Sequence, residues 1–188
     1  MPQPDPQSLA SLVLEFCRFP LQAQMITIDR HGMPIGRTLG ADLKPDYTVD
    51  LLTFPHFGRV KHLRRRPQSL LIWVEGKQPG CVYPRAVFVR GTAAIFEGNP
   101  VVEAYAARVA QGRELPHLVR PDMTFEEPRV LEAAEIRERM CLIRFTADEI
   151  RAEGFSAGSD PLERRELLHA VTWRPARPGS PTSRREGD

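Results

Sequence analysis

The segment Phe57-Gly58-Arg59 has the residue types in this 188-residue chain that are best suited to hold an anion. It lies at the start of an expected short helix, Gly58 to Arg66, where the first backbone N–H groups have no partner inside the helix. A phosphate dianion is held well by such N–H groups together with the rigid fork of an arginine and a hydroxyl. Glycine at 58 allows the backbone to approach a ligand closely. These residue types at a helix start are suited to holding a phosphate.

No other arrangement of residues predicts a different chemistry. A G-x-S-x-G motif, paired carboxylates and a Cys/His pair are all absent, so hydrolytic and nucleophilic mechanisms gain no support and we assign no catalytic residue. Neither the histidines nor the cysteines have metal-ligand spacing, so we predict no metal site and expect surface or turn histidines and reduced thiols, at least two of them packed as small hydrophobes. These residues are His31, His56, His62, His117, His169, Cys17, Cys81 and Cys141.

The charge balance gives no general reason to expect a nucleic-acid partner, because 26 basic residues stand against 24 acidic ones. The basic run from Lys61 to Arg66 is interpreted as a solvated helix face, since Val60 and Leu63 point to a core and no aromatic platform is interleaved. No segment approaches the roughly 20 apolar residues of a membrane helix, and the N-terminus does not resemble a signal peptide. We therefore expect a cytoplasmic protein with neither nucleic acid nor membrane as partner.

Apolar periodicity and turn residues predict an order of helices and strands that begins with a helix and a hairpin. The expected helices are 5–19, 58–66, 100–111, 128–139 and 160–169. The expected strands are 22–29 and 33–39 around the turn Arg30-His31-Gly32, then 48–54, 70–75, 82–96 and 140–145. Trp73 and Phe88 lie on strands and are expected in the core.

The predicted elements make an α+β protein, mainly β, whose antiparallel strands curl into a barrel with flanking helices. At 188 residues and 21.3 kDa the chain suits one domain, which we place at 1–173. The last segment, RPARPGSPTSRREGD, has almost no apolar content to bury, so residues 174–188 are predicted to be a disordered basic tail.

The region from Thr27 to Gly91 resembles the FMN-binding core of the pyridoxamine 5′-phosphate oxidase-like split β-barrels. The resemblance rests on TIDRHGMPIGRTL, LLTFPHFGRVKHLRRRPQSLLIWV and PRAVFVRGTAAIF. In that family an arginine on the second strand, a threonine ending the third and a basic residue opening the next short helix hold the FMN phosphate. The resemblance places Arg37, Thr53 and Arg59 in these roles.

The same resemblance implies a wider cofactor site and a function. Thr38 and Leu39 would present main-chain groups to the edge of the flavin ring, while Phe54, Gly58 and Lys61 would complete the site. The implied protein is an FMN-dependent oxidoreductase that transfers hydride to or from a small-molecule substrate through the flavin N5. The implied assembly is a homodimer with each cofactor between two subunits.

Departures from the family pattern leave alternatives open. Phe57 stands where the family often has serine, and Ala86 follows Arg85 where the oxidases proper have glutamine, so that particular oxidase activity is not implied. Related split barrels bind the deazaflavin F420 or haem. A cofactor-free dimeric binding or regulatory module is the alternative from another class.

Overall fold

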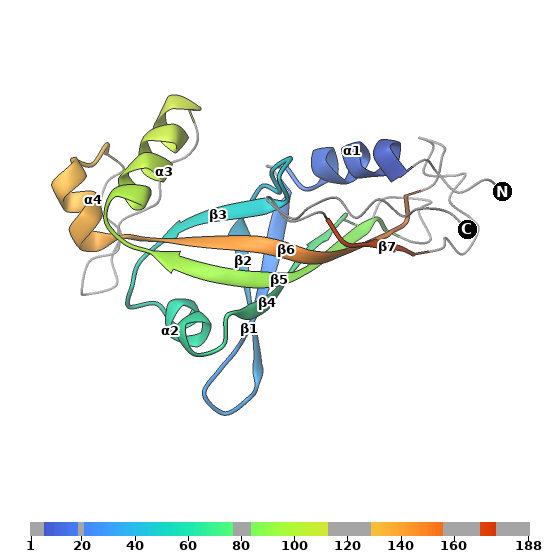
Figure 1. Cartoon of the computed structure of the whole chain (residues 1–188), viewed down its shortest axis with the longest axis horizontal. Helices are drawn as coiled ribbons and strands as arrows, with labels where there is room; N and C mark the ends of the chain where they lie inside the picture. The colour runs from blue at the N-terminus through green and yellow to red at the C-terminus, as the bar shows by residue number, and fades with distance from the viewer. Residues whose placement is uncertain (1–5, 19–20, 77–83, 113–128, 156–169, 176–188) are drawn as a thin grey trace, which may run out of the picture.

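The computed structural model describes residues 6–18, 21–76, 84–112, 129–155 and 170–175. Within them, a seven-stranded sheet carries helices at its two ends and on one side (Figure 1). The helices are α1 (Pro6–Phe16), α2 (Gly58–Arg65), α3 (Asn99–Ala110) and α4 (Ala133–Arg139). The strands are β1 (Gln22–Ile28), β2 (Pro34–Gly40), β3 (Thr48–Thr53), β4 (Gln68–Val74), β5 (Ala86–Phe96), β6 (Cys141–Glu153) and β7 (Val171–Trp173).

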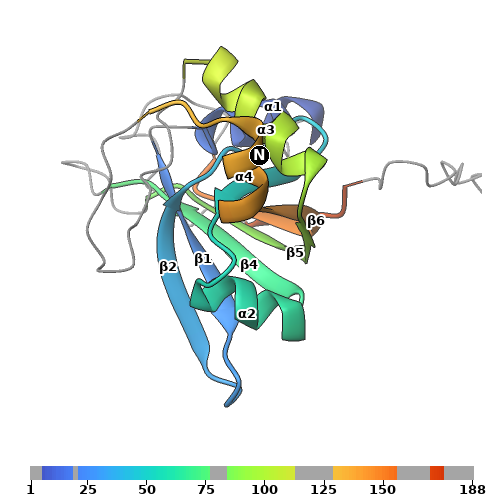
Figure 2. The same ribbon diagram turned by 90° about the vertical axis from the view of Figure 1, so that its left-hand side faces the viewer.

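The sheet is antiparallel throughout and runs in the order β2-β1-β4-β5-β6-β3, with β7 added to β6. Strands β2 and β3 follow one another in the chain but lie at opposite edges of this order. The strands curl around a shared interior (Figure 2), so the two edges form the split of a barrel. The predicted class, α+β with mainly antiparallel strands, is confirmed.

The main core fills the interior because alternate residues of each strand point inward. Strand β1 shows this pattern clearly, with Ala23, Met25 and Thr27 buried and their neighbours more exposed. Helix α1 closes one part of the barrel with Leu9 and Val13. Helix α2 closes another with Val60 and Leu63, which are buried as predicted.

The two aromatic residues expected in the core have different positions. Trp73 is completely buried and its Nε1 donates to the carbonyl oxygen of Ala41 at 3.3 Å, which confirms the prediction. For Phe88 the prediction is wrong, because its side chain is only half-buried. It faces the opposite side of the sheet from its strand neighbours Val87 and Val89, which fill the core.

A second, smaller core lies outside the barrel, where α3 and α4 pack on the ends of β3 and β6. Helix α4 begins at Ala133 rather than at 128, because the preceding segment is tied to α3 in an extended form. The Tyr105 hydroxyl donates to the carbonyl of Arg129 at 3.3 Å and accepts the N–H of Leu131 at 3.1 Å. The expected helix 160–169 lies outside the described residues.

Strand β6 is much longer than the predicted 140–145, and a β-bulge explains the difference. The pairing with β5 shifts between Arg90 and Gly91, so that the inward positions of β6 change from Ala147 to Ile150 across the bulge. The second half of β6 was not predicted for two reasons: the bulge breaks the two-residue period, and this half of the strand contains charged residues, which are depleted in strands. The short strand β7 was also not predicted.

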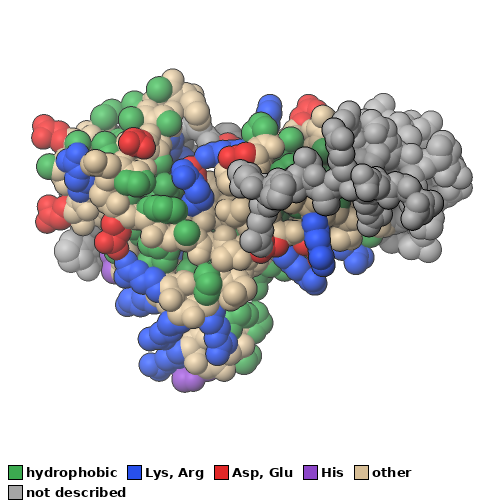
Figure 3. All heavy atoms as spheres, viewed as in Figure 1, with side chains coloured by type: hydrophobic (Ala, Val, Ile, Leu, Met, Phe, Trp, Pro, Cys, Tyr) green, Lys and Arg blue, Asp and Glu red, His purple; other side chains and the backbone are tan. Residues whose placement is uncertain are grey.

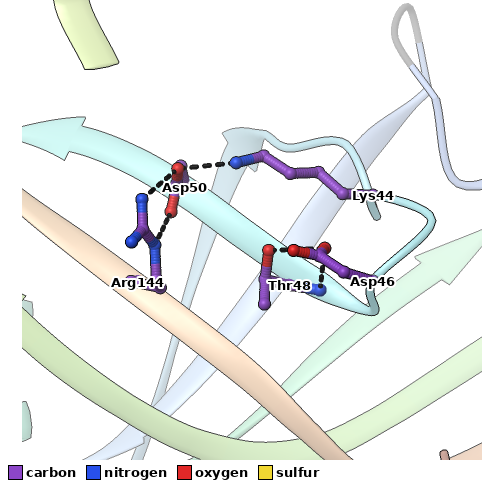
Figure 4. Close-up of polar contacts among 5 residues, drawn as sticks. All are labelled: Lys44, Asp46, Thr48, Asp50 and Arg144. Carbon is purple, nitrogen blue, oxygen red and sulfur yellow. Dashed lines mark hydrogen bonds and ion pairs between the residues drawn. The ribbon is translucent and has the colours of Figure 1, made fainter. Parts of the chain in front are cut away.

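Strand β3 is fixed to β6 by an ion pair as well as by its backbone (Figure 4). The Asp50 carboxylate accepts Nε and Nη2 of Arg144 at 2.8 and 2.9 Å, and Nζ of Lys44 at 2.6 Å. Burial by itself would raise the pKa of Asp50, but these bonds hold it below its usual value. Asp46 accepts the N–H and hydroxyl of Thr48 and so fixes the turn into the strand.

Replacing Gly91 with alanine should destabilise the fold by about 2–3 kcal/mol, because strained contacts in a packed interior have this order of cost. A Cβ at this position would lie 2.1 Å from the carbonyl oxygen of Thr146 and 2.5 Å from the Phe145 ring. Gly40→Ala is the matched control, since nothing lies within 4 Å of a Cβ there. Urea unfolding of both variants measures the difference, and equal midpoints would contradict the assignment.

Candidate functional site

The predicted phosphate residues Thr53 and Arg59 are in direct contact. Strand β3 ends at Thr53, a turn closed by the N–H of Phe57 on the carbonyl of Phe54 follows at 3.1 Å, and α2 begins at Gly58. Arg59, on the first turn of α2, reaches back so that its Nε and Nη2 donate to Thr53 Oγ1 at 3.1 and 2.8 Å. Thr53 is only 2% exposed, so this contact fixes the arginine at the end of the strand.

Arg59 carries its charge in a half-buried position that is poorly compensated. Burial lowers the pKa of Arg59, Cys141 acts in the opposite direction, and the nearby positive charge of Arg37 lowers it further. Among the described residues, neither arginine forms an ion pair with a carboxylate. The guanidinium instead lies 5.2 Å from the centre of the Phe57 ring. An anion bound here would remove the repulsion between the two arginines.

The start of α2 adds backbone donors to the two arginines. Phe57 is the N-cap residue, with extended torsions, and its side chain makes no capping hydrogen bond. A Cβ at Gly58 would meet nothing closer than the His62 ring at 3.8 Å, so packing inside the protein does not require glycine there. The helix therefore offers N–H groups without a side-chain cap beside Arg59.

The other predicted cofactor residues are distributed around this point. Arg37 and Thr38 are exposed on the edge strand β2, whereas the Leu39 side chain packs against the main core. Phe54 is buried in the second core, and Lys61 is exposed on α2. The structure thus brings Thr53 and Arg59 together, and the charge of Arg37 acts on Arg59 from the edge strand, while the side chains of Leu39 and Phe54 are occupied by packing.

The rest of the basic run on α2 faces solvent, as predicted. Lys61, Arg64, Arg65 and Arg66 are exposed, and Figure 3 shows basic side chains gathered over α2 and the β1–β2 hairpin. His62 is different, and the prediction of an ordinary surface residue is wrong for it. Its Nδ1 lies 3.0 Å from Oγ1 of the buried Thr27 and so fixes α2 to β1.

Cys141 is the residue next to the site that sequence reasoning did not place there. It is paired with Thr53 across β3 and β6 and is buried. Burial raises the pKa of Cys141 to about 11, although Arg64 and Arg59 act in the opposite direction. The thiol therefore stays protonated near neutral pH and is a packing group, as is the buried Cys17. Cys81 lies outside the described residues.

Two further features of the described residues bear on function. They contain no group of three or more side chains that could hold a metal ion. In the same part of the chain, no helix is long and apolar enough to span a bilayer.

No family model matches the sequence, and no curated protein matches it. Solved structures do share its fold. A pyridoxamine 5′-phosphate oxidase-related, FMN-binding protein from Nostoc punctiforme has a TM-score of 0.57 and 15% identity, with 93% of each chain covered. A heme-binding protein from Mycobacterium smegmatis has a TM-score of 0.53 and 13% identity, covering 92% of this chain and 60% of that one.

General stress protein 26 from Bacillus anthracis has a TM-score of 0.51 and 14% identity, covering 77% of this chain and 92% of that one. At such identities the likeness shows the fold. The chain has the split β-barrel fold of the pyridoxamine 5′-phosphate oxidase-like proteins, as the resemblance in sequence implied.

Replacing Thr53 with valine should lower the free energy of unfolding by about 1–2 kcal/mol, because two N–H groups of the half-buried Arg59 lose their acceptor. In the double variant with Arg59→Met the donors are gone as well, so the combined cost should be smaller than the sum by about 1 kcal/mol. Denaturant unfolding of the four proteins measures this coupling. Arg37→Met is the control partner, because Arg37 makes no bond to Thr53; additivity with Arg59→Met would refute the contact.

Proposed function

We propose that this split β-barrel binds FMN and acts as an oxidoreductase, with Arg37, Thr53 and Arg59 holding the cofactor phosphate. The observation that carries the proposal is the half-buried guanidinium of Arg59, held on Thr53 at the start of α2 and within reach of the charge of Arg37, with no carboxylate paired to either arginine among the described residues. A phosphate dianion supplies the two negative charges that this pair lacks. The Nostoc protein of the same fold is described as FMN-binding.

Each residue of the site can make a distinct bond to a phosphate. Arg59 has N–H groups beyond the two used on Thr53, and Arg37 adds a second guanidinium. The oxygen of Thr53 accepts from Arg59, which leaves its hydroxyl hydrogen for a phosphate oxygen. The N–H groups at the start of α2 complete a set of donors to one anion.

The edge position of β2 supports a place for the flavin ring. Main-chain groups on the outer side of an edge strand have no strand partner, and Arg37, Thr38 and Leu39 lie on such a strand. When bound, FMN would supply the hydride chemistry at its N5. The chain would bind the phosphate, orient the ring along β2 and leave its other face to a small-molecule substrate. Lys61 would add a charge at the rim of the site.

The flavin site is open to solvent at Arg37 and Thr38, which are exposed. We propose that a second copy of the chain covers this side in a homodimer. Light scattering of the purified protein should then give a mass of about twice 21.3 kDa. A mass equal to that of one chain, in the presence and absence of FMN, would contradict the dimer.

Titration with FMN, followed by flavin fluorescence and absorption, tests the proposed cofactor. The wild-type protein should bind FMN saturably. The double variant Arg37→Ala/Arg59→Ala should lose about 3 kcal/mol or more, roughly a hundredfold in affinity, because charge-assisted bonds from two guanidinium groups disappear. Arg65→Ala, at an exposed position of the same helix, should bind as the wild type does. Equal affinity of the double variant and the wild type would refute the site.

Parallel titrations separate FMN from the alternatives. Saturable binding of haemin or of F420 with no binding of FMN would show that the cofactor of this barrel is haem or F420 and not FMN. A protein that binds none of the three would support the cofactor-free module.

A further inference from the structure

Positive charge is concentrated on α2 and on the β1–β2 hairpin. The segments 28–37 and 58–66 contain seven arginines and lysines, and we call their joint surface the basic ridge. Asp29 is the one carboxylate within these segments, and Glu97 reaches them from the end of β5 to pair with Arg64. With both carboxylates counted, five positive charges are in excess here, whereas the whole chain carries only +2. Figure 3 shows these basic side chains gathered on one side of the molecule.

Contacts at two places join the helix to the hairpin, so the charges lie on one surface. In the middle of α2, His62 Nδ1 lies 3.0 Å from Thr27 Oγ1 on β1. At the end of the helix, Arg66 lies beside the hairpin turn, since a Cβ on Gly32 would be 3.7 Å from its Nη1. The basic ridge is therefore held together by the fold.

Four exposed cations of the ridge have no opposite charge. Arg30, Lys61, Arg65 and Arg66 form no ion pair with a carboxylate in the part of the chain that the structure describes. Nε of Arg30 donates to Nε2 of His31 at 2.8 Å, which supplies no charge. The carboxyl end of α2 offers the equivalent of about half a negative charge, which offsets only part of the excess. The remaining repulsion would be relieved by a partner with several negative charges.

The shape of the ridge indicates what kind of partner can reach these charges. Helix α2 and the β1–β2 hairpin project together from the barrel, on the side away from α1 and α3 (Figure 1). The major groove of B-form DNA, about 12 Å wide, admits a helix or a two-stranded ribbon of this kind. A flat bilayer would meet only the outermost part of such a projection.

The composition of the ridge narrows the class of nucleic acid. It contains no Phe, Tyr or Trp on which the bases of a single strand could stack. It also contains no Asn or Gln, the side chains that pair with adenine edges, so binding through phosphates is expected to be independent of sequence. The major groove of A-form RNA is too narrow for the ridge. Double-stranded DNA fits these properties.

We propose that the basic ridge is a second binding site, which docks double-stranded DNA. The hairpin turn with Arg30 enters the major groove, and Lys61, Arg65 and Arg66 bond to phosphates beside it. This site needs neither Thr53 nor a bound flavin. The proposal replaces the expectation, drawn from the overall charge balance, that nucleic acid is not a partner.

Fluorescence anisotropy of a labelled DNA duplex of mixed sequence tests the proposal with the full-length, flavin-free protein. Binding should be saturable and roughly micromolar at about 0.1 M salt. The logarithm of the association constant should fall against that of the salt concentration with a slope of about −4, because four phosphates are neutralised. Arg65→Gln/Arg66→Gln should bind at least about tenfold more weakly and reduce that slope by about 2.

Arg18→Gln/Arg151→Gln is the matched control, because it removes two exposed charges of the same kind away from the ridge. It should bind as the wild type does. Equal affinities of the two double variants would overturn the proposal. Single-stranded DNA, double-stranded RNA and phosphatidylserine vesicles are the competing partners, and binding of any of them at least as tightly as the duplex would also overturn it.

A second pair of variants tests whether the hairpin turn enters the groove. Met33 beside the turn is 60% exposed, and Val130 in the segment before α4 is 62% exposed, so neither replacement disturbs a core. Met33→Glu should weaken duplex binding about tenfold by bringing a negative charge against the phosphates, whereas Val130→Glu should leave it unchanged. Melting temperatures near that of the wild type show that the variants are folded. Equal effects of the two glutamates would refute the docking of the hairpin.

Discussion

The antiparallel pairing of β5 with β6 is the constraint on which the rest of the structure depends. These are the two longest strands, and β6 also pairs with β3 and β7. The bulge at Gly91 sets the register of the pair, since two backbones approach there more closely than any side chain would allow. The register of β3 on β6 in turn places Thr53 opposite Cys141, at the end where the chain turns into α2. The position of Arg59 follows from that turn.

Strand β3 contacts charged side chains at two places, and only at one of them does an opposite charge match them. At one end, Asp50 is fully matched by Arg144 and Lys44, and the pair stabilises the edge of the barrel. At the other end, Thr53 holds Arg59 with a neutral hydroxyl, which accepts hydrogen bonds but supplies no charge. A half-buried guanidinium without a carboxylate costs stability in the free protein. Such a cost is expected where the missing charge belongs to a ligand, and this is the physical basis for the proposed phosphate site.

The fold alone does not determine the function. Solved proteins of this fold include one described as FMN-binding and one described as heme-binding, so the same barrel serves different cofactors. What distinguishes this chain lies in its own residues. The Arg59 guanidinium lies over the ring of Phe57. Arg85 is paired with Glu75 and lies over the rings of Phe16 and Phe155.

The sequence by itself determined the elements whose signals are local. Most strands and the place of α2 follow from local features of the sequence. These features are the alternation in β1, the turn at Gly32, the stop at Pro67 and the apolar pair Val60 and Leu63. The proximity of Thr53 and Arg59 can also be predicted from the sequence, because a strand end and a helix start six residues apart must lie close together.

Only the tertiary structure decided the features that join distant segments. The extension of β6 depends on β5 and on a bulge that breaks its pattern. The Tyr105 hydroxyl holds the segment before α4 in an extended form, so α4 begins later in the chain than predicted. The contact with Thr27 makes His62 a residue that fixes α2 to β1 rather than a surface residue. The Asp50–Arg144 pair joins residues 94 positions apart. Each of these contacts depends on which strands become neighbours, and the sheet order, with β2 and β3 at opposite edges, is set by the packing of the whole barrel rather than by any short stretch of sequence.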